Sequence, residues 1–372
     1  MKLNVVADSP RGPKYKQILD ELRMGITTGQ YGEGDRIPSE NDLSERFRVS
    51  RLTVQRALKE LQIEGLVNRR AGSGTYVSSR KGAHGHLFGL IIPGLGDTEI
   101  FEPICQGIAK AGRNGNHALL WGDTTKNLDG RAEQARQLCR TYIERRVSGV
   151  FFAPIEGIPQ KESVNVAIAE MIAKAGIPLV LLDRGIYPYP ERSRFDLVGI
   201  DNRRAGYRMG LHLIDQGVCR LAFLAHPDSA PTVEARLVGY RDALAARKLS
   251  GERVAWCDPS NVAAVRQVFD EMNPDGFLCA NDVTAVQLMQ TLDTLDIHVP
   301  DQVKMVGIDD VRYASHLRVP LTTLRQPCQE IGEMAFLAML SRIAEPQLPA
   351  RDILLACTLV VRQSCGGRAQ TN

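Results

Sequence analysis

The sequence lacks the segments that take a protein into or across a membrane. Its N-terminal residues contain no apolar core of signal-peptide length, because Asp8 and Arg11 interrupt them. No later run approaches the roughly 20 consecutive apolar residues that a membrane-spanning helix needs. We therefore expect a cytoplasmic protein without a membrane partner.

Cysteine and histidine occur, but in no arrangement typical of a disulfide framework or a metal site. The eight cysteines form no CxxC pair, and several lie in apolar runs, as Cys279 does in GFLCAND. Reduced thiols are the simplest interpretation. His84 and His86 lie close together, but neither a cysteine nor an acidic residue accompanies them. We expect no metal ion and no cofactor.

Signatures of catalysis are missing as well. The only candidate for a phosphate-binding loop, 94–96, reads GLG and continues as DTE instead of completing G-x-G-x-x-G. No Ser/His/Asp or Cys/His set has an evident arrangement, so we expect no enzyme activity. Two alternatives remain: an enzyme with a nucleotide-binding sheet, which turnover assays would reveal, and a transport-type sugar binder. A transport-type binder would need a signal peptide and would not carry a basic N-terminal region; cell fractionation would test this alternative.

Charge is distributed unevenly along the chain. Residues 1–81 contain 15 Lys and Arg against 10 Asp and Glu, a net charge of +5, whereas residues 82–372 contain 31 against 33, a net charge of −2. A basic front on a slightly acidic body suggests an anionic partner for the front alone.

The basic front predicts three short helices followed by a hairpin. Apolar residues at helical spacing place the first helix at 14 to about 29. Ser39, with an acidic residue three positions on, is a candidate N-cap of the second helix. Ser50 is a candidate N-cap of the third, which runs over 51–64 and ends before Gly65.

A two-turn helix, a tight turn and a second capped helix form a helix-turn-helix. The second helix of such a unit enters the major groove of DNA, and its first turns here present Arg51, Thr53, Gln55 and Arg56. Thr53 can bond a phosphate or touch a thymine methyl, and Gln55 can pair with adenine. The two arginines can reach guanine or phosphate.

The residues after Gly65 predict a wing. The sequence LVNRRAGSGTYVS alternates around 72–74, which is typical of a hairpin. Its tip would lie against the minor groove or the DNA backbone, with Arg69 and Arg70 at its base. Arginines that neutralise phosphates supply affinity, whereas contacts with base edges supply sequence choice.

These motifs, from Tyr15 to Val77, resemble the GntR-type winged helix. They read YKQI, GDRIPSENDL, VSRLTVQRALKEL, EGLV and GSGTYV. Two positions depart from the family pattern: Asn41 stands where a basic residue is common and Gln55 where an arginine is common, so the operator sequence cannot be borrowed from relatives. The resemblance and the helix-turn-helix together assign DNA contact to Ser39, Asn41, Ser50, Arg51, Thr53, Gln55, Arg56, Arg69, Arg70 and Gly72.

Residues 79–86 are polar and contain glycine, which predicts a linker. Beyond them, amphipathic stretches alternate with apolar runs at 87–93, 117–122, 149–154, 178–183, 197–201, 220–226, 276–282 and 304–310. Nearly continuous apolar strands between helices predict a parallel sheet covered on both faces. One such sheet would be wide, so two α/β lobes that divide near 190–202 are equally natural.

Residues 87–365 resemble the effector-binding domain of LacI-type regulators, which is similar to periplasmic sugar-binding proteins. The motifs are PLVLLDR, VGIDNRRAGY, RLAFL, EARLVGYRDAL, CANDVTA, VPDQVKMVGIDD, PLTTLRQP and VVRQSC. The resemblance implies an α+β winged-helix domain at 1–78, followed at 87–372 by a two-lobed α/β domain with parallel sheets and three crossovers. This combination is similar to the arabinose-type repressors of bacteria.

Polar residues follow several of the apolar strands, at the edge that lines the ligand crevice in open α/β sheets. Carboxylates, amides and arginines there suit a ligand covered in hydroxyls. The resemblance places effector contacts at Asp183, Arg184, Arg236, Asn281, Asp309 and Gln326. Phe101 can stack on an apolar sugar face, and Trp256 is a weaker candidate. For three residues core or loop roles compete with ligand contact: Asp310, which can brace a loop, and Phe151 and Phe152, which can pack in the core.

The two regions together predict a homodimeric transcription regulator that binds double-stranded operator DNA. A sugar-like ligand between the lobes would close them and change the spacing of the two heads, and hence operator affinity, by about 1–3 kcal/mol. A two-fold dimer would bind a near-palindromic operator. We expect repression that the ligand relieves, with corepression and activation as alternatives.

Overall fold

The computed structural model describes residues 14–32, 34–63, 65–70, 73–77, 85–92, 95, 99–122, 130–158, 160–227 and 229–367. They form two compact units: a head that reaches His86 and takes in 113–117, and an effector domain that contains the remaining described residues from Leu87 onward. Gly72 and most of the predicted linker lie outside the described residues, and Arg70 is described by its backbone alone.

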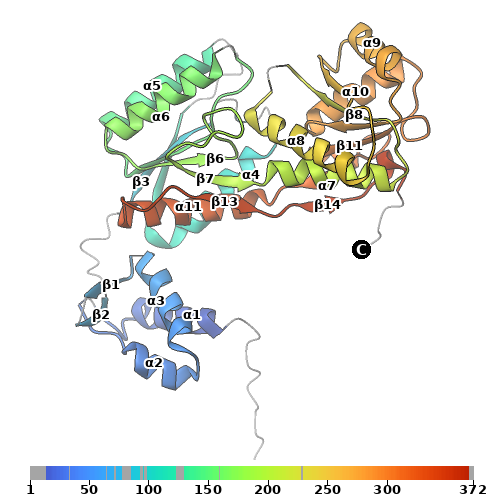
Figure 1. The fold of residues 1–372 in the computed structure, drawn as a ribbon. Helices are drawn as coiled ribbons and strands as arrows, with labels where there is room; N and C mark the ends of the chain where they lie inside the picture. The colour runs from blue at the N-terminus through green and yellow to red at the C-terminus, as the bar shows by residue number, and fades with distance from the viewer. Residues whose placement is uncertain are drawn as a thin grey trace, which may run out of the picture. The chain divides into compact units, whose positions relative to one another are not determined.

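The head is a three-helix unit with a hairpin, as the sequence predicts (Figure 1). Its elements are α1 (Lys14–Thr27), α2 (Glu40–Phe47), α3 (Arg51–Ile63), β1 (Val67–Arg70) and the antiparallel β2 (Gly74–Val77). Ile18, Leu43, Val54 and Leu61 come from three different helices, and all are buried in one apolar core. Helical spacing of these residues therefore defines the head, although α1 ends slightly earlier than expected.

The effector domain alternates strands and helices in two lobes. Lobe 1 begins with β3 (Leu87–Ile91), α4 (Phe101–Gly112), the short η1 (Arg113–Gly115, grouped with the head), β4 (Ala118–Trp121), α5 (Arg131–Glu144), β5 (Gly149–Phe152), α6 (Lys161–Lys174), β6 (Leu179–Leu182) and β7 (Asp196–Ile200). Lobe 2 contains α7 (Asn202–Asp215), β8 (Leu221–Ala225), α8 (Pro231–Ala246), β9 (Val254–Trp256), α9 (Val262–Met272), β10 (Gly276–Cys279), α10 (Asp282–Thr294), β11 (Lys304–Asp309), η3 (Arg312–Ser315) and β12 (Thr322–Arg325). The chain then adds α11 (Cys328–Ala344), β13 (Asp352–Leu355), β14 (Thr358–Val360) and η4 (Gln363–Cys365).

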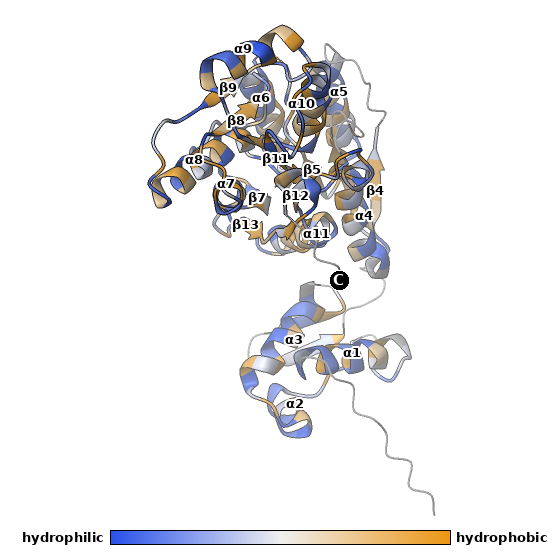
Figure 2. Cartoon of the chain, turned by 90° about the vertical axis from the view of Figure 1, so that its right-hand side faces the viewer, coloured by the Kyte–Doolittle hydropathy of each residue, from blue (hydrophilic) through white to orange (hydrophobic). Residues whose placement is uncertain are grey.

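Each lobe is built on a six-stranded sheet. The strand order is β13-β7-β6-β5-β3-β4 in lobe 1 and β14-β12-β11-β10-β8-β9 in lobe 2. All pairs are parallel except that between β12 and β14. Strands such as β8 are coloured hydrophobic in Figure 2, because helices cover the sheets and bury them. Two lobes, rather than one wide sheet, are therefore the solution that this sequence adopts.

The chain crosses between the lobes three times, as the resemblance implies. The first crossover is at Asp201, between β7 and α7; the second is at 326–327, between β12 and α11; and the third is at 356–357, between β13 and β14. The strands β9, β12, β13 and β14 are absent from the sequence prediction, because all four are short and the last three also carry polar residues. Among the described residues, no helix is long and apolar enough to cross a membrane.

The C-terminal segment is anchored to lobe 1 by close packing and by a buried ion cluster. The helix α11 packs on α4, where a Cβ on Gly332 would lie 2.0 Å from a carbonyl oxygen of α4. At the start of β7, Asp196 is fully buried and accepts hydrogen bonds from Arg342 (Nη2, 3.0 Å) and Arg351 (Nη2, 3.0 Å). Although burial by itself raises it, the pKa of Asp196 is lowered, because these two arginines donate to the carboxylate.

Candidate DNA-binding surface and interlobe site

The helix-turn-helix is capped where the sequence predicts. The Ser39 hydroxyl accepts a hydrogen bond from the Asp42 backbone N–H (3.3 Å), and the Asp42 carboxylate accepts one from the Ser39 backbone (3.0 Å). This reciprocal capping box starts α2, and the bond from Ser39 lowers the pKa of Asp42. At α3, the Ser50 hydroxyl accepts from the Thr53 backbone (3.3 Å), so both predicted caps orient their helices.

Three of the predicted DNA-contact residues contact a side chain of another element of the head. Gln55 on α3 donates through Nε2 to Glu40 Oε2 (2.9 Å), and Arg69 on the hairpin donates to the other oxygen of Glu40. Arg56 lies 4.0 Å above the Tyr15 ring. Glu40 thus joins the recognition helix to the wing, a role that helical spacing and polarity alone did not indicate.

Four other predicted contacts lie at the start of α2 and α3. Asn41, Ser50 and Arg51 are exposed, and Thr53 is half-buried. Leu52 lies between two of these residues and is 77% exposed, the largest value among the exposed large hydrophobics of the described chain. The sequence prediction considered only polar residues of this helix for DNA contact and missed Leu52. An apolar side chain at this position suits a thymine methyl group.

The interlobe site lies at the carboxyl ends of parallel strands from both lobes. Asp183 follows β6, Asp309 ends β11, and Gln326 follows β12 at the second crossover. Asp183 has φ +66° and Asp309 has φ +131°, values in the left-handed region that favours glycine. Strained backbone at aspartates that line a cleft is typical of functional sites.

In lobe 1 the site is an ion cluster centred on Arg184. Its Nη1 lies 2.6 Å from Glu156 Oε1, and its Nε donates to Asp183 Oδ2 (3.0 Å). The guanidinium lies 5.4 Å from the centre of the Phe101 ring. Although burial by itself raises it, the pKa of Glu156 is lowered, because the charge of Arg184 lies beside it and those of Arg236 and Lys161 add to the effect. The sequence prediction missed Glu156, which follows β5 in a loop without a recognised motif.

In lobe 2 the site is centred on Arg236, which is buried on α8. Its Nε donates to Asn202 Oδ1 (2.9 Å) and its Nη1 to the Ala280 carbonyl (2.6 Å), while Nη2 lies 3.9 Å from Asp309 Oδ1. Gln326 Nε2 donates to the same Asp309 oxygen (2.7 Å). Burial raises the pKa of Asp309 well above its usual range, and the nearby carboxylates reinforce this, while Arg236 opposes it.

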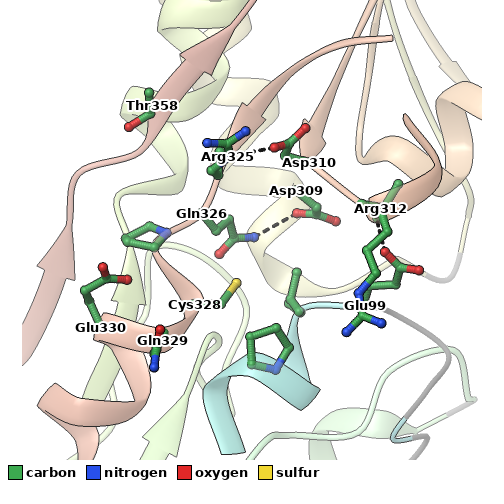
Figure 3. Close-up of a pocket in the computed structure, with 14 residues that line it drawn as sticks. Glu99, Asp309, Asp310, Arg312, Arg325, Gln326, Cys328, Gln329, Glu330 and Thr358 are labelled. Atoms are coloured by element: carbon green, nitrogen blue, oxygen red, sulfur yellow. Dashed lines mark hydrogen bonds and ion pairs between the residues drawn. The ribbon is translucent and has the colours of Figure 1, made fainter. Parts of the chain in front are cut away.

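Two cavities open on these clusters. One, of about 390 Å³, is lined by Asp309, Gln326 and Cys328, with Arg312 and Glu99 at its side (Figure 3). The other, of about 340 Å³, is lined by residues that include Asp183, Arg184 and Asn202. Both volumes are large enough for a small organic ligand.

The remaining predicted residues have structural surroundings. Asn281 caps α10 by accepting from the Thr284 backbone (2.8 Å). Asp310 braces the loop after β11 through ion pairs with Arg325 and Arg362, each at 2.6 Å. Phe151 and Phe152 are fully buried on β5, inside the sheet of lobe 1, and Trp256 is 42% exposed on the edge strand β9.

Two different protein-family models match the head and the effector domain. Residues 14–77 match the family model described as "Bacterial regulatory proteins, gntR family", and residues 211–365 match "Periplasmic binding protein-like domain". The chain joins a gntR-type DNA-binding head to a periplasmic-binding-protein-like domain. It is a transcription regulator of this two-part type.

Relatives and solved structures match different shares of the chain. An "Arabinose metabolism transcriptional repressor" of Geobacillus stearothermophilus is 28% identical over 95% of this chain and 97% of its own length. The "HTH-type transcriptional repressor PurR" of Vibrio atlanticus is 30% identical over 59% of this chain and 64% of its own. The structure "transcriptional regulator CelR-cellobiose complex" is 25% identical, with a TM-score of 0.63, over 84% of this chain and 90% of that one.

In this periplasmic-binding-protein-like domain the two lobes touch at the rim of the site. Lys161 at the start of α6 donates to the Ser229 carbonyl of lobe 2 (2.6 Å). The Arg312 backbone N–H of lobe 2 donates to the Glu99 carboxylate of lobe 1, and the Arg312 side chain lies 3.4 Å from Glu102. These contacts hold the lobes together around the buried arginines.

Proposed function

We propose that the chain binds operator DNA through its gntR-type head and that a small, sugar-like ligand between the lobes sets the operator affinity. One observation carries the second part. Among the described residues, two acceptors of the site are buried without a hydrogen-bond partner, Asp183 Oδ1 in lobe 1 and Gln326 Oε1 at a crossover. One donor, Arg184 Nη1, also makes no hydrogen bond and is held by its ion pair with Glu156. Buried acceptors without a partner destabilise a protein by about 1–3 kcal/mol each, so a ligand that donates to both is favoured.

The ligand acts on the relation between the lobes. Asp183 belongs to lobe 1, whereas Asp309 belongs to lobe 2, so one ligand that contacts both binds the closed arrangement more tightly than an open one. That difference in binding energy is what changes operator affinity, by about 1–3 kcal/mol. The proposal requires neither a cofactor nor a metal ion.

The chain acts as a homodimeric repressor that its ligand releases from DNA. The relatives' names, which are those of repressors, support the sense of regulation. A pair of heads related by two-fold symmetry binds two half-sites in a near-palindromic operator, and two heads bind more tightly than one.

Selection of bound sequences from random DNA by the purified full chain tests the head. We expect enrichment of a near-palindromic sequence, and a gel-shift assay with that sequence should show weaker binding when one of a panel of pentoses and hexoses is added. The variant Gln326→Ala should bind the DNA and lose the sugar response, whereas Gln267→Ala, on the exposed face of α9, should keep both. Enrichment without any sugar response, or no enrichment at all, contradicts the proposal.

A further inference from the structure

Both arginines of the interlobe site are already occupied by protein acceptors. Arg184 has a carboxylate on each side, Glu156 at 2.6 Å and Asp183 at 3.0 Å. Arg236 uses Nε and Nη1 on the oxygens of Asn202 and Ala280, and its third nitrogen faces Asp309. An anionic ligand group that approached either guanidinium would therefore meet a carboxylate already in place.

Glu156 supplies the charge that neutralises Arg184 from the side opposite Asp183. Its lowered pKa means that the carboxylate is ionised at neutral pH. The positive groups that face it are Arg184, Arg236 and Lys161, and the last of these also donates to the Ser229 carbonyl. Without Glu156 the lobe 1 cluster would have one guanidinium and one carboxylate, and Arg184 Nη1 would be free for a ligand.

The cavity walls add further negative charge. Four carboxyl groups line the larger cavity, from Glu99, Asp309, Asp310 and Glu330. Asp310 is paired with Arg362 outside the lining, and burial raises the pKa of Asp309. Two arginines of the lining, Arg312 and Arg325, oppose these groups. Both of these arginines also have acidic partners, as Figure 3 shows for Arg325 and Asp310. A carboxylate or phosphate on the ligand would be repelled by this lining.

Two of the three buried atoms of the site that make no hydrogen bond are acceptors and need a donor from the ligand; the third, Arg184 Nη1, faces the Glu156 carboxylate at 2.6 Å. Gln326 Nε2 is occupied by Asp309, so the atom that remains is the carbonyl oxygen Oε1, and on Asp183 it is Oδ1. A hydroxyl group donates one hydrogen bond, whereas an ionised carboxylate or phosphate oxygen donates none. The two orphaned atoms and the paired arginines therefore favour the same ligand chemistry.

We propose that the ligand is an uncharged polyhydroxyl compound, and that Glu156 excludes analogues carrying a carboxylate or phosphate by occupying Arg184. This inference rests on the proposed function, because it concerns the same interlobe site. It assigns a role in ligand specificity to Glu156, which contacts Arg184 and is not among the effector contacts that the sequence predicts.

Calorimetric titration of the full chain with matched probes tests the ligand class. The probes are D-arabinose, D-xylose, D-ribose, D-galactose and D-glucose, together with galacturonate, glucuronate and the corresponding 5- or 6-phosphates. At least one neutral sugar should bind, and its anionic counterpart should bind at least tenfold more weakly. An anionic probe that binds as tightly as its neutral counterpart overturns the inference and leaves the proposed function standing. Binding by no probe contradicts both.

Variants at position 156 test the assigned residue. Glu156→Gln keeps the shape and removes the charge, and it should reduce the preference for the neutral probe at least tenfold, through a gain in binding of the anionic one. Glu156→Asp should retain the preference. Glu162→Gln, the same change at an exposed position nearby on α6, should leave it unaltered. An unchanged preference in folded Glu156→Gln overturns the role of Glu156, and if that variant does not fold, loss of the preference in Glu156→Asp overturns it instead.

Discussion

The DNA-binding head and the interlobe site present their charged side chains in opposite ways. In the head, Arg51 is exposed, and pairs such as Arg69 with Glu40 lie near the surface. At the interlobe site, Arg184 and Arg236 are buried, and each faces an acidic partner. Exposed ion pairs add little stability and exchange readily, whereas buried pairs are strongly destabilised when one member is lost.

This difference determines how each region selects its partner. The head offers cations that can leave an exposed carboxylate for a phosphate, so its partner is recognised by the charges that project. The effector domain neutralises its own cations, so under the proposed function its ligand is recognised by the buried acceptors that have no hydrogen-bond partner, Asp183 Oδ1 and Gln326 Oε1.

Loss of the buried ion cluster in lobe 1 should have the largest effect. Asp196→Ala leaves Arg342 and Arg351 without their shared acceptor, and we expect the free energy of unfolding of the effector domain to fall by about 3–5 kcal/mol at pH 7. Tryptophan fluorescence during urea unfolding measures this, because both tryptophans of the chain, Trp121 and Trp256, lie in the effector domain.

The matched control is Asp352→Ala, which removes the partly exposed ion pair with Arg192 at 2.9 Å and should change the free energy of unfolding by less than about 1 kcal/mol.

Because the folded-state pKa of Asp196 is lowered, its stabilisation is present above the unfolded pKa of about 4 and is lost as the pH falls through the folded value. Equal losses in the two variants at pH 7 would show that the buried cluster is not special.

Removing an exposed cation from the head should affect DNA binding alone. Arg51→Ala loses either a phosphate or a guanine contact, and operator affinity should fall about 10- to 100-fold, or about 1–3 kcal/mol. Calorimetric binding of the effector-site sugar should not change. Arg23→Ala, on α1 in an ion pair with Asp20, is the control. A comparable loss of DNA binding in the control would contradict a specific role for Arg51.

The buried carboxylate of Asp309 should make the stability of the effector domain depend on pH in the opposite sense to Asp196. Its folded-state pKa is raised, chiefly by burial, so the folded chain retains a proton that the unfolded chain releases above pH about 4. The stabilisation is lost as the pH rises through the folded value. Asp309→Asn should therefore gain on the order of 1 kcal/mol relative to the unmodified chain between pH 5 and pH 8, measured by urea unfolding. A constant difference across this range would argue against a raised pKa.

Leu52 should contribute the smallest and most specific effect. If it touches a thymine methyl in the operator, replacing that thymine by uracil removes one apolar contact of about 0.8 kcal/mol, which is about fourfold in affinity. We expect one position of the selected operator to show this loss with the unmodified chain and not with Leu52→Ala. Gel shifts with uracil scanned through every thymine of the operator measure it, and identical scans for both proteins would remove Leu52 from base recognition.

Much of the fold follows from local sequence patterns. The three head helices, the capping box at Ser39 and eight strands are visible as apolar periodicity and caps, which depend on neighbours in the chain. The strand β12 is not visible in this way, because Thr322 and Thr323 are buried through hydrogen bonds to distant residues rather than through apolar character.

The site divides in the same way. Asp183, Asp309 and Gln326 lie at strand ends, where sequence and family resemblance place them, and the structure brings them to the cavities. Glu156 lies in no recognised motif, and Glu40 lies inside GDRIPSENDL, but both escape prediction because each acts on a side chain of another element, Arg184 and Gln55 respectively. Pairing between such residues is a property of the folded chain alone.

The strand order of lobe 1 has a consequence for synthesis of the chain on the ribosome. The winged-helix elements α1 to β2 lie within residues 14–77, whereas the sheet of lobe 1 is complete only when β13, at Asp352–Leu355, has emerged. At ordinary translation rates the winged helix is synthesised roughly 15–60 s before the last strand of the lobe 1 sheet. A nascent chain therefore contains the complete winged helix before its effector domain can fold.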